Sequence, residues 1–393
     1  MARLIDITGK AVSGEWGFDD ETGDGIPVIR TTNFTNDGVV NYNDIVTRKI
    51  IKKNLDEKYL RKGDIIIEKS GGSDKFPVGR VIYFDGEENT YLFNNFTGLL
   101  RVKNQELWYT KYVFYSLFFN YKRGGTRAFE NKTTGLHNLK TDEYVRRYEV
   151  TERSRNEQIL ICEKLDRAYS IIKSRQLELL LLDELIKARF VEMFGDPVKN
   201  PKGWEVVTIG DIVTEVRYGT SKPAVEGGKY PYLRMNNLTA DGHLDLNDLK
   251  YIDIPDDEIE KCVVRKGDVL FNRTNSIELV GKTVVFDLQE DMIIAGYIIR
   301  VRLNKRLLPE ILSQYMNLEA LKDILRSMAK GAVNQANINA QELQSIKVYI
   351  PDMELQKQFI EMKNQVDKSK VAVQKALDET QMLFYSLMQE YFG

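Results

Sequence analysis

Residues that build metal centres or disulfide frameworks are scarce in this chain. Its 393 residues include two cysteines, Cys162 and Cys262, in no Cys-x-x-Cys pattern, and two histidines, His137 and His243. A structural zinc site needs about four closely spaced Cys or His ligands, and a disulfide framework needs more cysteines. We therefore expect neither a zinc-dependent nor a disulfide-stabilised fold.

Long apolar runs and a strong net charge are also missing. The start, "MARLIDITGKAVSGEW", has no signal-peptide core, and no stretch approaches roughly 18 uninterrupted apolar residues. We expect a soluble, cytoplasmic protein. The net charge of −2 argues against coating of nucleic acid by the whole surface. It leaves room for local basic patches, for which 111–127 and 215–223 are candidates, although such segments are often solvated loops.

The motifs of catalysis are absent or incomplete. "SIELVGKT" (276–283) resembles a phosphate-binding P-loop but has Ser276 in place of its first glycine. No two of the nine prolines are adjacent, which excludes the (N/D)PP(Y/F) motif of amino-methyltransferases. Glu361 and Lys363 have the spacing of a nuclease motif but lie in a predicted helix, and no Ser-His-Asp arrangement is evident. The sequence predicts recognition without catalysis.

An internal repeat is the main feature that is present. "PVIRTTNFTNDG" (27–38) recurs as "PYLRMNNLTADG" (231–242), and "RKGDIII" (61–67) recurs as "RKGDVLF" (265–271). Further matches pair "GRVIYFD" with "GKTVVFD", Arg101-Val102 with Arg300-Val301, and "EMFG" (192–195) with "EYFG" (390–393). The offset falls steadily from 204 to 198 along these matches. A duplication with small deletions produces such a drift, whereas chance matches scatter.

Each repeat has a globular part followed by a helical part. Residues 1–153 and 196–353 alternate short strands with turn signals and contain a helical stretch, at 109–120 and 308–329. Residues 154–195 and 354–393 lack proline and lack glycine until their last positions, and each predicts one long helix. The fold class is α/β (α+β), with two tandem mixed domains separated by two long helices.

The two predicted helices have heptad-like seams. A packed antiparallel coiled coil within the chain explains two matched helices better than separate packing of each helix on its own domain, which is the alternative. The predicted seam comprises Leu165, Ile172, Leu179, Leu182 and Ile186 in the first helix, and Phe359, Met362, Val366, Val373, Leu383 and Leu387 in the second.

A helix of roughly 39 residues spans about 58 Å at 1.5 Å per residue. The helix pair would then hold two similar domains apart around a pseudo-twofold axis. Duplex DNA has the same local symmetry, so two domains on a rod are suited to two separated half-sites.

The succession of motifs, found twice, resembles the specificity subunits of type I restriction–modification systems. The resemblance covers the whole chain, from "NPKGWEVVTIGDI" (200–212) and the tip at 219–223 to "GAVNQANINAQELQSIKVYIP" (331–351) and "ELQKQFIEM" (354–362). Its counterparts in the first repeat are "TTGLHNLKTDEYVRRYEV" (133–150) and "NEQILICEKL" (156–165). The first repeat departs from the pattern because it lacks a counterpart of "PKGWEVV".

The resemblance implies a division of labour. Residues 1–153 and 196–353 would be target-recognition domains, each reading one half of a split double-stranded DNA sequence. The helices 154–195 and 354–393 would set the gap between half-sites and dock two methyltransferase subunits, which motor-nuclease subunits would join. S-adenosylmethionine, ATP and magnesium would belong to those partners, so the chain itself would be a non-catalytic subunit without a cofactor or metal.

Base reading needs Arg, Lys, Asn or Gln at groove edges, with Ser, Thr and backbone amides on phosphates. Candidates are expected in loops at strand ends. In the first domain they are Arg30, Thr31, Asn33, Lys69, Ser70, Gly71, Gly72, Ser73, Lys75, Arg123, Arg127, Asn131 and Lys132. In the second they are Arg217, Thr220, Ser221, Lys222, Arg234, Asn236, Asn237, Asn272, Arg273, Thr274, Asn275, Ser276, Lys330, Asn334 and Gln335.

The repeat separates these candidates into two groups. Arg30 and Asn33 recur as Arg234 and Asn237, which favours a role in the fold or in phosphate contact, since the two domains read different half-sites. "EKSGGSDK" and "NRTNSIEL" differ between the copies, which favours base specificity.

Two other functions remain open at this stage. A coiled-coil adaptor whose paired domains bind proteins or glycans would suit the near-neutral charge, and weak salt dependence of DNA binding would favour it. A chain that itself methylates or cleaves DNA would need activity in isolation.

Overall fold

The structure is a computed structural model that describes residues 1–52, 54–133, 136–332 and 335–393. Its chain forms two compact units: unit 1 is Met1–Ser174 with Ala376–Gly393, and unit 2 is Arg175–Lys375. Among the described residues, no helix is long and apolar enough to cross a membrane.

Helices α4 (Arg155–Phe194) and α10 (Met353–Phe392) match the two predicted long helices. Helix α4 begins at a capping box, in which Ser154 Oγ accepts from Glu157 N at 3.3 Å and Glu157 accepts from Ser154 N at 2.8 Å. It ends before Gly195, whose φ of 88° is the left-handed conformation that terminates helices.

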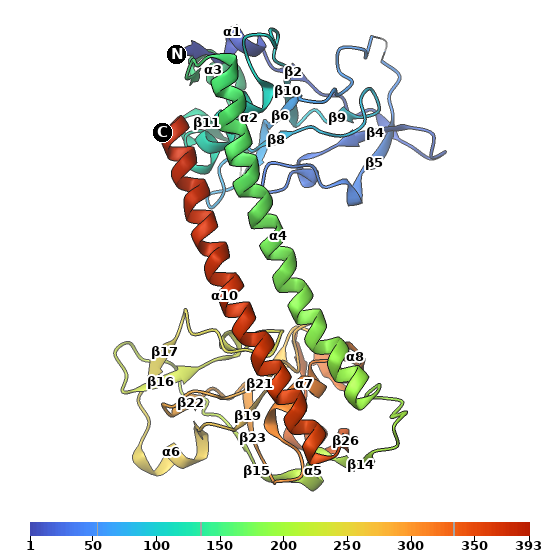
Figure 1. The fold of residues 1–393 in the computed structure, drawn as a ribbon, viewed down its shortest axis with the longest axis vertical. Helices are drawn as coiled ribbons and strands as arrows, with labels where there is room; N and C mark the ends of the chain where they lie inside the picture. Colours follow the sequence, from blue (N-terminus) through green and yellow to red (C-terminus); the bar gives the residue numbers. More distant parts are fainter. Residues whose placement is uncertain (53, 134–135, 333–334) are drawn as a thin grey trace. The chain divides into compact units, whose positions relative to one another are not determined.

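In each unit a segment of α4 packs beside a segment of α10 (Figure 1). In unit 1, Tyr169 and Phe384 have ring centroids 6.4 Å apart, and Lys164 Nζ lies 3.3 Å from Tyr391 Oη. In unit 2, Phe190 and Phe359 are 5.2 Å apart, and Lys370 pairs with Asp183. Residue numbers rise along α4 as they fall along α10, so the helices form the predicted antiparallel coiled coil.

The predicted seam is buried along most of its length. Leu165, Ile172, Ile186, Phe359, Val366 and Val373 are buried, and Leu179, Leu182, Met362 and Leu387 are partly buried. Leu383 is a correction: it is 54% exposed, while the adjacent Phe384 is buried. A straight helix turns about 20° per heptad away from a strict seven-residue repeat, which moves the contact line from Leu383 to Phe384 and Met388.

Unit 1 holds two four-stranded sheets, one three-stranded sheet and a short strand pair among its described residues. The first sheet has the order β2 (Val12–Ser13), β10 (Thr97–Leu100), β6 (Ile65–Glu68) and β8 (Val81–Tyr83). The second has the order β3 (Phe18–Asp19), β5 (Val46–Lys49), β4 (Ile26–Ile29) and β9 (Leu92–Phe93). The third has the order β11 (Glu130–Thr133), β12 (Leu136–Leu139) and β7 (Ser70–Gly72). Strands β1 (Ala2–Arg3) and β13 (Glu149–Val150) pair, and the helices are α1 (Leu4–Thr8), α2 (Thr110–Lys122) and α3 (Thr141–Arg147).

Unit 2 repeats most of these elements. Its first sheet runs β15 (Val213–Tyr218), β23 (Ile298–Leu303), β19 (Val269–Asn272) and β21 (Thr283–Val285). The second runs β17 (Lys250–Ile252), β16 (Tyr230–Leu233), β22 (Met292–Ile294) and β18 (Val263–Val264). This second sheet has the edge strand β18 beside β22, whereas that of unit 1 has β3 beside β5. The third runs β20 (Thr274–Asn275), β25 (Gln335–Asn337) and β24 (Lys330–Ala332), and β14 (Glu205–Thr208) pairs with β26 (Lys347–Ile350). The short helices are α5 (Ile209–Ile212), α6 (Asp256–Cys262), α7 (Pro309–Met316), α8 (Glu319–Met328) and α9 (Ala340–Ser345).

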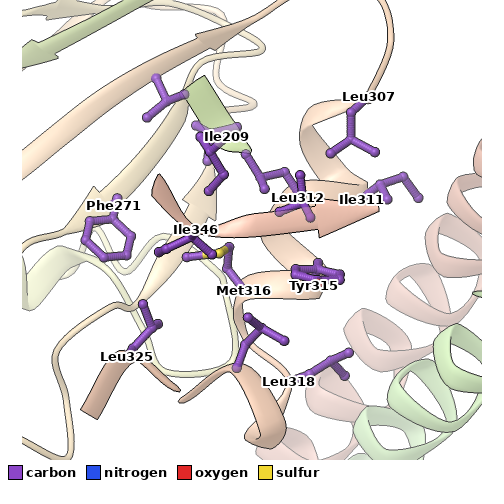
Figure 2. Close-up of a cluster of buried hydrophobic side chains, with 14 of the residues drawn as sticks. Ile209, Phe271, Leu307, Ile311, Leu312, Tyr315, Met316, Leu318, Leu325 and Ile346 are labelled. Atoms are coloured by element: carbon purple, nitrogen blue, oxygen red, sulfur yellow. The ribbon is translucent and has the colours of Figure 1, made fainter. Parts of the chain in front are cut away.

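Where the sequence predicts one helical stretch at 308–329, the structure has α7 and α8. The break is at Asn317, whose side chain accepts from Lys322 Nζ at 3.0 Å and donates to Thr283 O at 2.6 Å. These bonds turn the chain while the apolar faces of both helices stay in the core. Figure 2 shows that core, where Leu312 and Met316 of α7 and Leu325 of α8 lie near Phe271 and Ile346.

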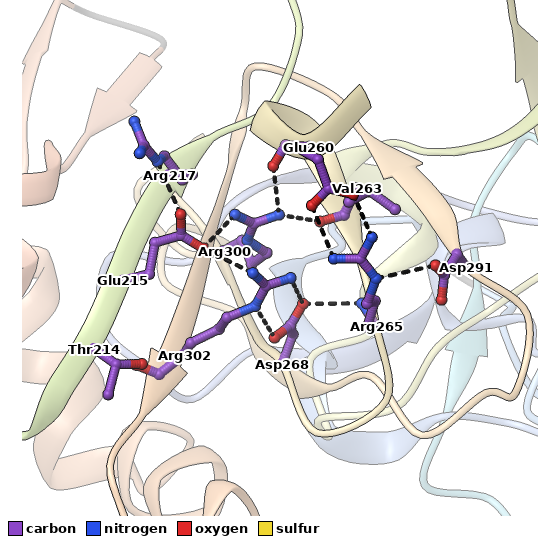
Figure 3. A network of polar contacts seen from close by, with 10 residues as sticks. All are labelled: Thr214, Glu215, Arg217, Glu260, Val263, Arg265, Asp268, Asp291, Arg300 and Arg302. Carbon is purple, nitrogen blue, oxygen red and sulfur yellow. Dashed lines mark hydrogen bonds and ion pairs between the residues drawn. The ribbon is translucent and has the colours of Figure 1, made fainter. Parts of the chain in front are cut away.

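A buried arginine network joins the strands of the first sheet in unit 2 (Figure 3). Glu215 accepts from Arg300 at 2.6 Å and from Arg302 at 2.8 Å, and Arg302 also binds Asp268 at 2.8 Å. In unit 1, Arg101 binds Asp64 at 2.8 Å in the same way. Arg101 is therefore equivalent to Arg302, which corrects the sequence match with Arg300, and Leu99 occupies the place of Arg300.

Candidate nucleic-acid interface

The repeated Arg-x-x-Asn pattern forms the same turn in both units. Asn33 Oδ1 accepts from Arg30 N at 2.9 Å, Asn33 Nδ2 donates to Asp44 O at 2.9 Å, and Arg30 Nη2 binds the Asp44 carboxylate at 3.0 Å. In unit 2, Asn237 accepts from Arg234 N at 2.8 Å, and Arg234 binds Asp248 at 2.8 Å.

The asparagines of this turn are buried. Asn33 and Asn237 are only 1% and 2% exposed, and their amides hold the turn. Arg30 and Arg234 are ion-paired across the turn and keep about a quarter of their side chains exposed (23% and 28%). These four residues stabilise the turn, which agrees with the role in the fold that their repetition favours.

The third sheet of each unit, here called the small sheet, brings distant candidates together. In unit 1, β7 carries Ser70, Gly71 and Gly72, and it pairs with β12, which pairs with β11, the strand of Asn131 and Lys132. In unit 2, β20 with Thr274 and Asn275 pairs with β25, which begins at Gln335 and pairs with β24, which begins at Lys330. Asn334 lies outside the described residues. The segments expected as loops are thus partly strands, because they pair with chain about 60 residues further on.

A hydrogen-bonded loop follows the small sheet of unit 1. Ser73 N donates to Phe76 O at 2.7 Å, and Phe76 N donates to Ser73 Oγ at 3.1 Å. Arg127 donates to the carbonyls of Asp74 at 3.3 Å and Lys75 at 3.4 Å. The loop keeps Ser73, Lys75 and Arg127 exposed. The side chain of Arg127 therefore positions the loop as well as adding charge beside it.

Two cavities flank this sheet. One, of about 300 Å³, is lined by Gly71, Ser73 and Tyr121, and a Glu68–Arg80 ion pair of 2.9 Å also lines it. The other, of about 660 Å³, is lined by Lys69, Lys140, Arg146 and Arg147 with acidic neighbours.

Lys69 is the half-buried cation of the second cavity. Its Nζ donates to Ser13 Oγ at 2.9 Å; burial lowers the pKa of Lys69, and nearby Lys58 lowers it further. Sequence reasoning missed Lys140 and Arg146, which are exposed on this cavity. Their signal was present in "LKTDEYVRR", where basic residues flank the short helix α3.

In unit 2 the predicted "NRTNSIEL" run is partly internal. Asn272 has no exposed surface; its Nδ2 donates to Thr274 O and Tyr297 O at 3.2 Å, and its Oδ1 accepts from Asn275 Nδ2 at 2.9 Å. Thr274 is 6% exposed and donates to Asn337 Oδ1 at 2.9 Å. Asn272 and Thr274 therefore face inward and join the strand ends. Arg273 keeps partial exposure, with its guanidinium 4.9 Å from the Tyr218 ring centroid.

The tip at 219–223 is held by its neighbours. Thr220 Oγ1 accepts from Lys222 N at 3.2 Å, and Lys222 Nζ binds Glu258 at 2.8 Å. Arg217 binds Glu215 at 3.1 Å yet is 57% exposed, and Ser221 is exposed.

The remaining predicted residues lie at or near the surface. Thr31, Asn275 and Ser276 are partly exposed, and Arg123, Asn131, Asn236 and Gln335 are exposed. In the part of the chain that the structure describes, no three His, Cys, Asp or Glu side chains form a metal-binding group.

The fold has two repeated α/β units with paired helices, and the small sheets of the two units carry different polar side chains. The profile of the type I restriction modification DNA specificity domain matches residues 4–180 and again 201–380. The chain belongs to this family.

Two relatives illustrate the range of similarity. The type I restriction enzyme EcoKI specificity subunit of Escherichia coli is 25% identical over 401 residues, covering 94% of this chain and 82% of the relative. The MjaX specificity subunit of Methanocaldococcus jannaschii is 29% identical over 196 residues, which is 49% of this chain. The match spans less than half of that relative, 46% of its length.

Solved structures share the fold. The chain matches one from a study of complex assembly and conformational transition of the type I R-M system, with a TM-score of 0.59, 17% identity and coverage of 100% and 96%. It also matches the type I S subunit of M. genitalium, with a TM-score of 0.54, 14% identity and coverage of 100% and 95%.

Proposed function

We propose that this chain is the DNA-specificity subunit of a type I restriction–modification complex. Residues 1–153 and 196–353 act as target-recognition domains, each reading one half-site of a bipartite sequence. The observation that carries the proposal is the small sheet, which occupies the same place in both units and carries different side chains. Lys69-Ser70-Gly71 in one corresponds to Arg273-Thr274-Asn275 in the other. Two domains that recognise different half-sites need the same backbone scaffold with different polar side chains on it.

The exposed members of the predicted set are the proposed contacts. Ser73, Lys75, Arg127 and Asn131 surround the small sheet of unit 1, and Arg273, Ser276 and Gln335 surround that of unit 2. Their side chains include the Arg, Lys, Asn and Gln groups that pair with base edges and phosphates.

The helices 154–195 and 354–393 serve as spacer and as dock for two methyltransferase subunits, which motor-nuclease subunits join. Leu177, Leu181 and Leu185 support this part of the proposal, because they are spaced by four on α4 and are 55%, 60% and 43% exposed. S-adenosylmethionine, ATP and magnesium bind those partners, and this chain contributes no catalytic group. The complex works in the cytoplasm.

Domain exchange tests the proposal. The complex with its methyltransferase subunits is expected to bind one bipartite sequence far better than random duplex. Replacing residues 1–153 by the corresponding domain of a relative is expected to change one half-site and leave the other, as read by sequencing of methylated host DNA. Unchanged specificity would contradict the proposal.

The adaptor alternative has no support from the family to which the chain belongs. It predicts that DNA binding is weak or independent of salt, whereas phosphate contacts make affinity fall steeply with salt through counterion release. Titration at two salt concentrations separates the two.

A further inference from the structure

Two exposed aromatic side chains occupy equivalent places in the two units. Phe96 is 51% exposed in the turn between β9 and β10, and Tyr297 is 49% exposed in the turn between β22 and β23. The surrounding sequences, "LFNNFTGLL" and "MIIAGYIIRV", have little in common. An exposed aromatic residue alone is ordinary, but the same exposure at the same place in both copies calls for a shared reason.

The backbone of the two turns is the same. Thr97 N donates to Asn94 O at 3.1 Å, and Ile298 N donates to Ala295 O at 2.9 Å. In both turns the aromatic residue is third of four. The turns also bind the neighbouring parallel strand, β4 or β16, alike, through Asn94 N to Ile29 O at 3.0 Å and Ala295 N to Leu233 O at 2.9 Å. The two rings are therefore carried by equivalent rigid turns.

The backbone of each turn pairs with the basic residue that precedes the small sheet. Lys69 N donates to Phe96 O at 2.8 Å, and Arg273 N donates to Tyr297 O at 2.9 Å. The next residues, Ser70 and Thr274, begin β7 and β20. An aromatic residue and a basic residue are thus backbone neighbours at one edge of each small sheet.

A glycine of another strand end contacts the backbone of each turn. A Cβ on Gly14 would lie 2.2 Å from the carbonyl oxygens of Phe93 and Asn94, and a Cβ on Gly219 would lie 2.2 Å from Ile294 O. Both glycines allow a neighbouring strand end to contact the turn backbone directly. The backbone at the start of each turn is therefore packed directly against another strand end.

We propose that Phe96 and Tyr297 are sequence-independent aromatic contacts to double-stranded DNA, one in each recognition domain. The inference rests on the proposed function. Each ring packs on the apolar deoxyribose edge of the duplex backbone, and Lys69 or Arg273 binds phosphate. Sugar and phosphate are the same at every base pair, so such contacts carry no sequence information directly. Since both units present the same pair of groups, the contact positions each domain, and the loops that differ read the bases.

The test uses the full chain with its methyltransferase subunits and two fluorescent duplexes, one with the methylated target sequence and one random. Phe96→Ala and Tyr297→Ala are each expected to weaken binding roughly tenfold to both duplexes, which leaves the ratio of affinities nearly unchanged. Phe96→Tyr and Tyr297→Phe are expected to bind as the unaltered chain does. Phe18→Ala and Tyr251→Ala, at aromatic residues 64% and 44% exposed on other strands, are the matched controls and should have no effect.

Salt dependence identifies the kind of contact. Removing an aromatic ring releases no fewer counterions, so Phe96→Ala should keep the slope of affinity against salt concentration, whereas Lys69→Ala should reduce that slope by about one. Normal affinity of both alanine variants, or loss of affinity for the target alone, would overturn the inference. Failure of the unaltered complex to prefer any bipartite sequence would instead overturn the proposed function.

Discussion

Arg300 donates a hydrogen bond of 2.6 Å to Glu215 from a side chain that has no exposed surface. Removing one partner of a buried ion pair costs about 3–5 kcal/mol when the charge that remains is buried and unpaired. Arg300→Leu leaves Glu215, which is 29% exposed and still binds Arg302 at 2.8 Å, whereas Glu215→Gln leaves the charge of Arg300 buried. Unit 1 already has Leu99 at this place. Arg300→Leu is therefore expected to change the free energy of unfolding by less than about 1 kcal/mol, and Glu215→Gln to lower it by roughly 3 kcal/mol, as measured by chemical denaturation. A larger loss in Arg300→Leu would contradict this assignment.

Because Lys322 is buried, we expect the free energy of unfolding to rise with pH in the alkaline range. Burial lowers its pKa to about 8, and its Nζ donates to Gly281 O at 2.6 Å. An unfolded lysine has a pKa of about 10.4, so the unfolded state binds more protons between these values and stability increases with pH across this window. Chemical denaturation at pH 7.5, 9 and 10 should show this rise in the unaltered chain and a weaker rise in Lys322→Met. Parallel curves for the two proteins would show that Lys322 does not cause the rise.

Adjacent asparagines provide a matched pair for the repeated turn. Asn237 is buried and bonded to Arg234 N and Asp245 O, each at 2.8 Å, whereas Asn236 is exposed. Asn237→Ala leaves buried backbone groups without partners and should lower the free energy of unfolding by about 2–4 kcal/mol. Asn236→Ala should change it by less than about 0.5 kcal/mol. If both variants reduced DNA affinity without loss of stability, the turn would be a reading site after all.

The length of the helices should set the gap between half-sites. Insertion of four residues, about one turn, near Ser174 of α4 or near Val371 of α10 lengthens a helix by roughly 6 Å, close to two base pairs. Binding to duplexes of varied gap length is expected to show a preference shifted by about that amount. An unchanged preference would show that the helices are not the ruler.

The exposed leucines of α4 predict where a methyltransferase subunit binds. Leu181→Glu with Leu185→Glu places two charges on the apolar stripe and should abolish co-purification of the methyltransferase subunit while leaving the thermal unfolding midpoint nearly unchanged. Val225→Glu, at a residue 43% exposed in a loop of unit 2, is the control and should co-purify normally. Equal yields from both variants would exclude this stripe as the dock.

Several residues show where sequence reasoning stops. The turn role of Asn33 and Asn237 followed from their repetition, and the long helices followed from the absence of proline and glycine in 154–194. The burial of Asn272 and Thr274 did not, because Asn272 pairs with Ile298 of β23 and Thr274 pairs with Asn337 of β25, both distant in the sequence. Phe96 and Tyr297 were missed because their equivalence is in backbone geometry and not in neighbouring letters.

The sequence by itself determined the duplication, the two long helices and the family, since periodicity, breakers and repeated motifs are properties of local chain order. The tertiary structure alone decided which polar side chains face outward. It also decided that Phe384 is buried in the helix seam in place of Leu383, and that Arg101 corresponds to Arg302. These outcomes depend on helix twist and strand register, which are set by packing between segments far apart in the chain.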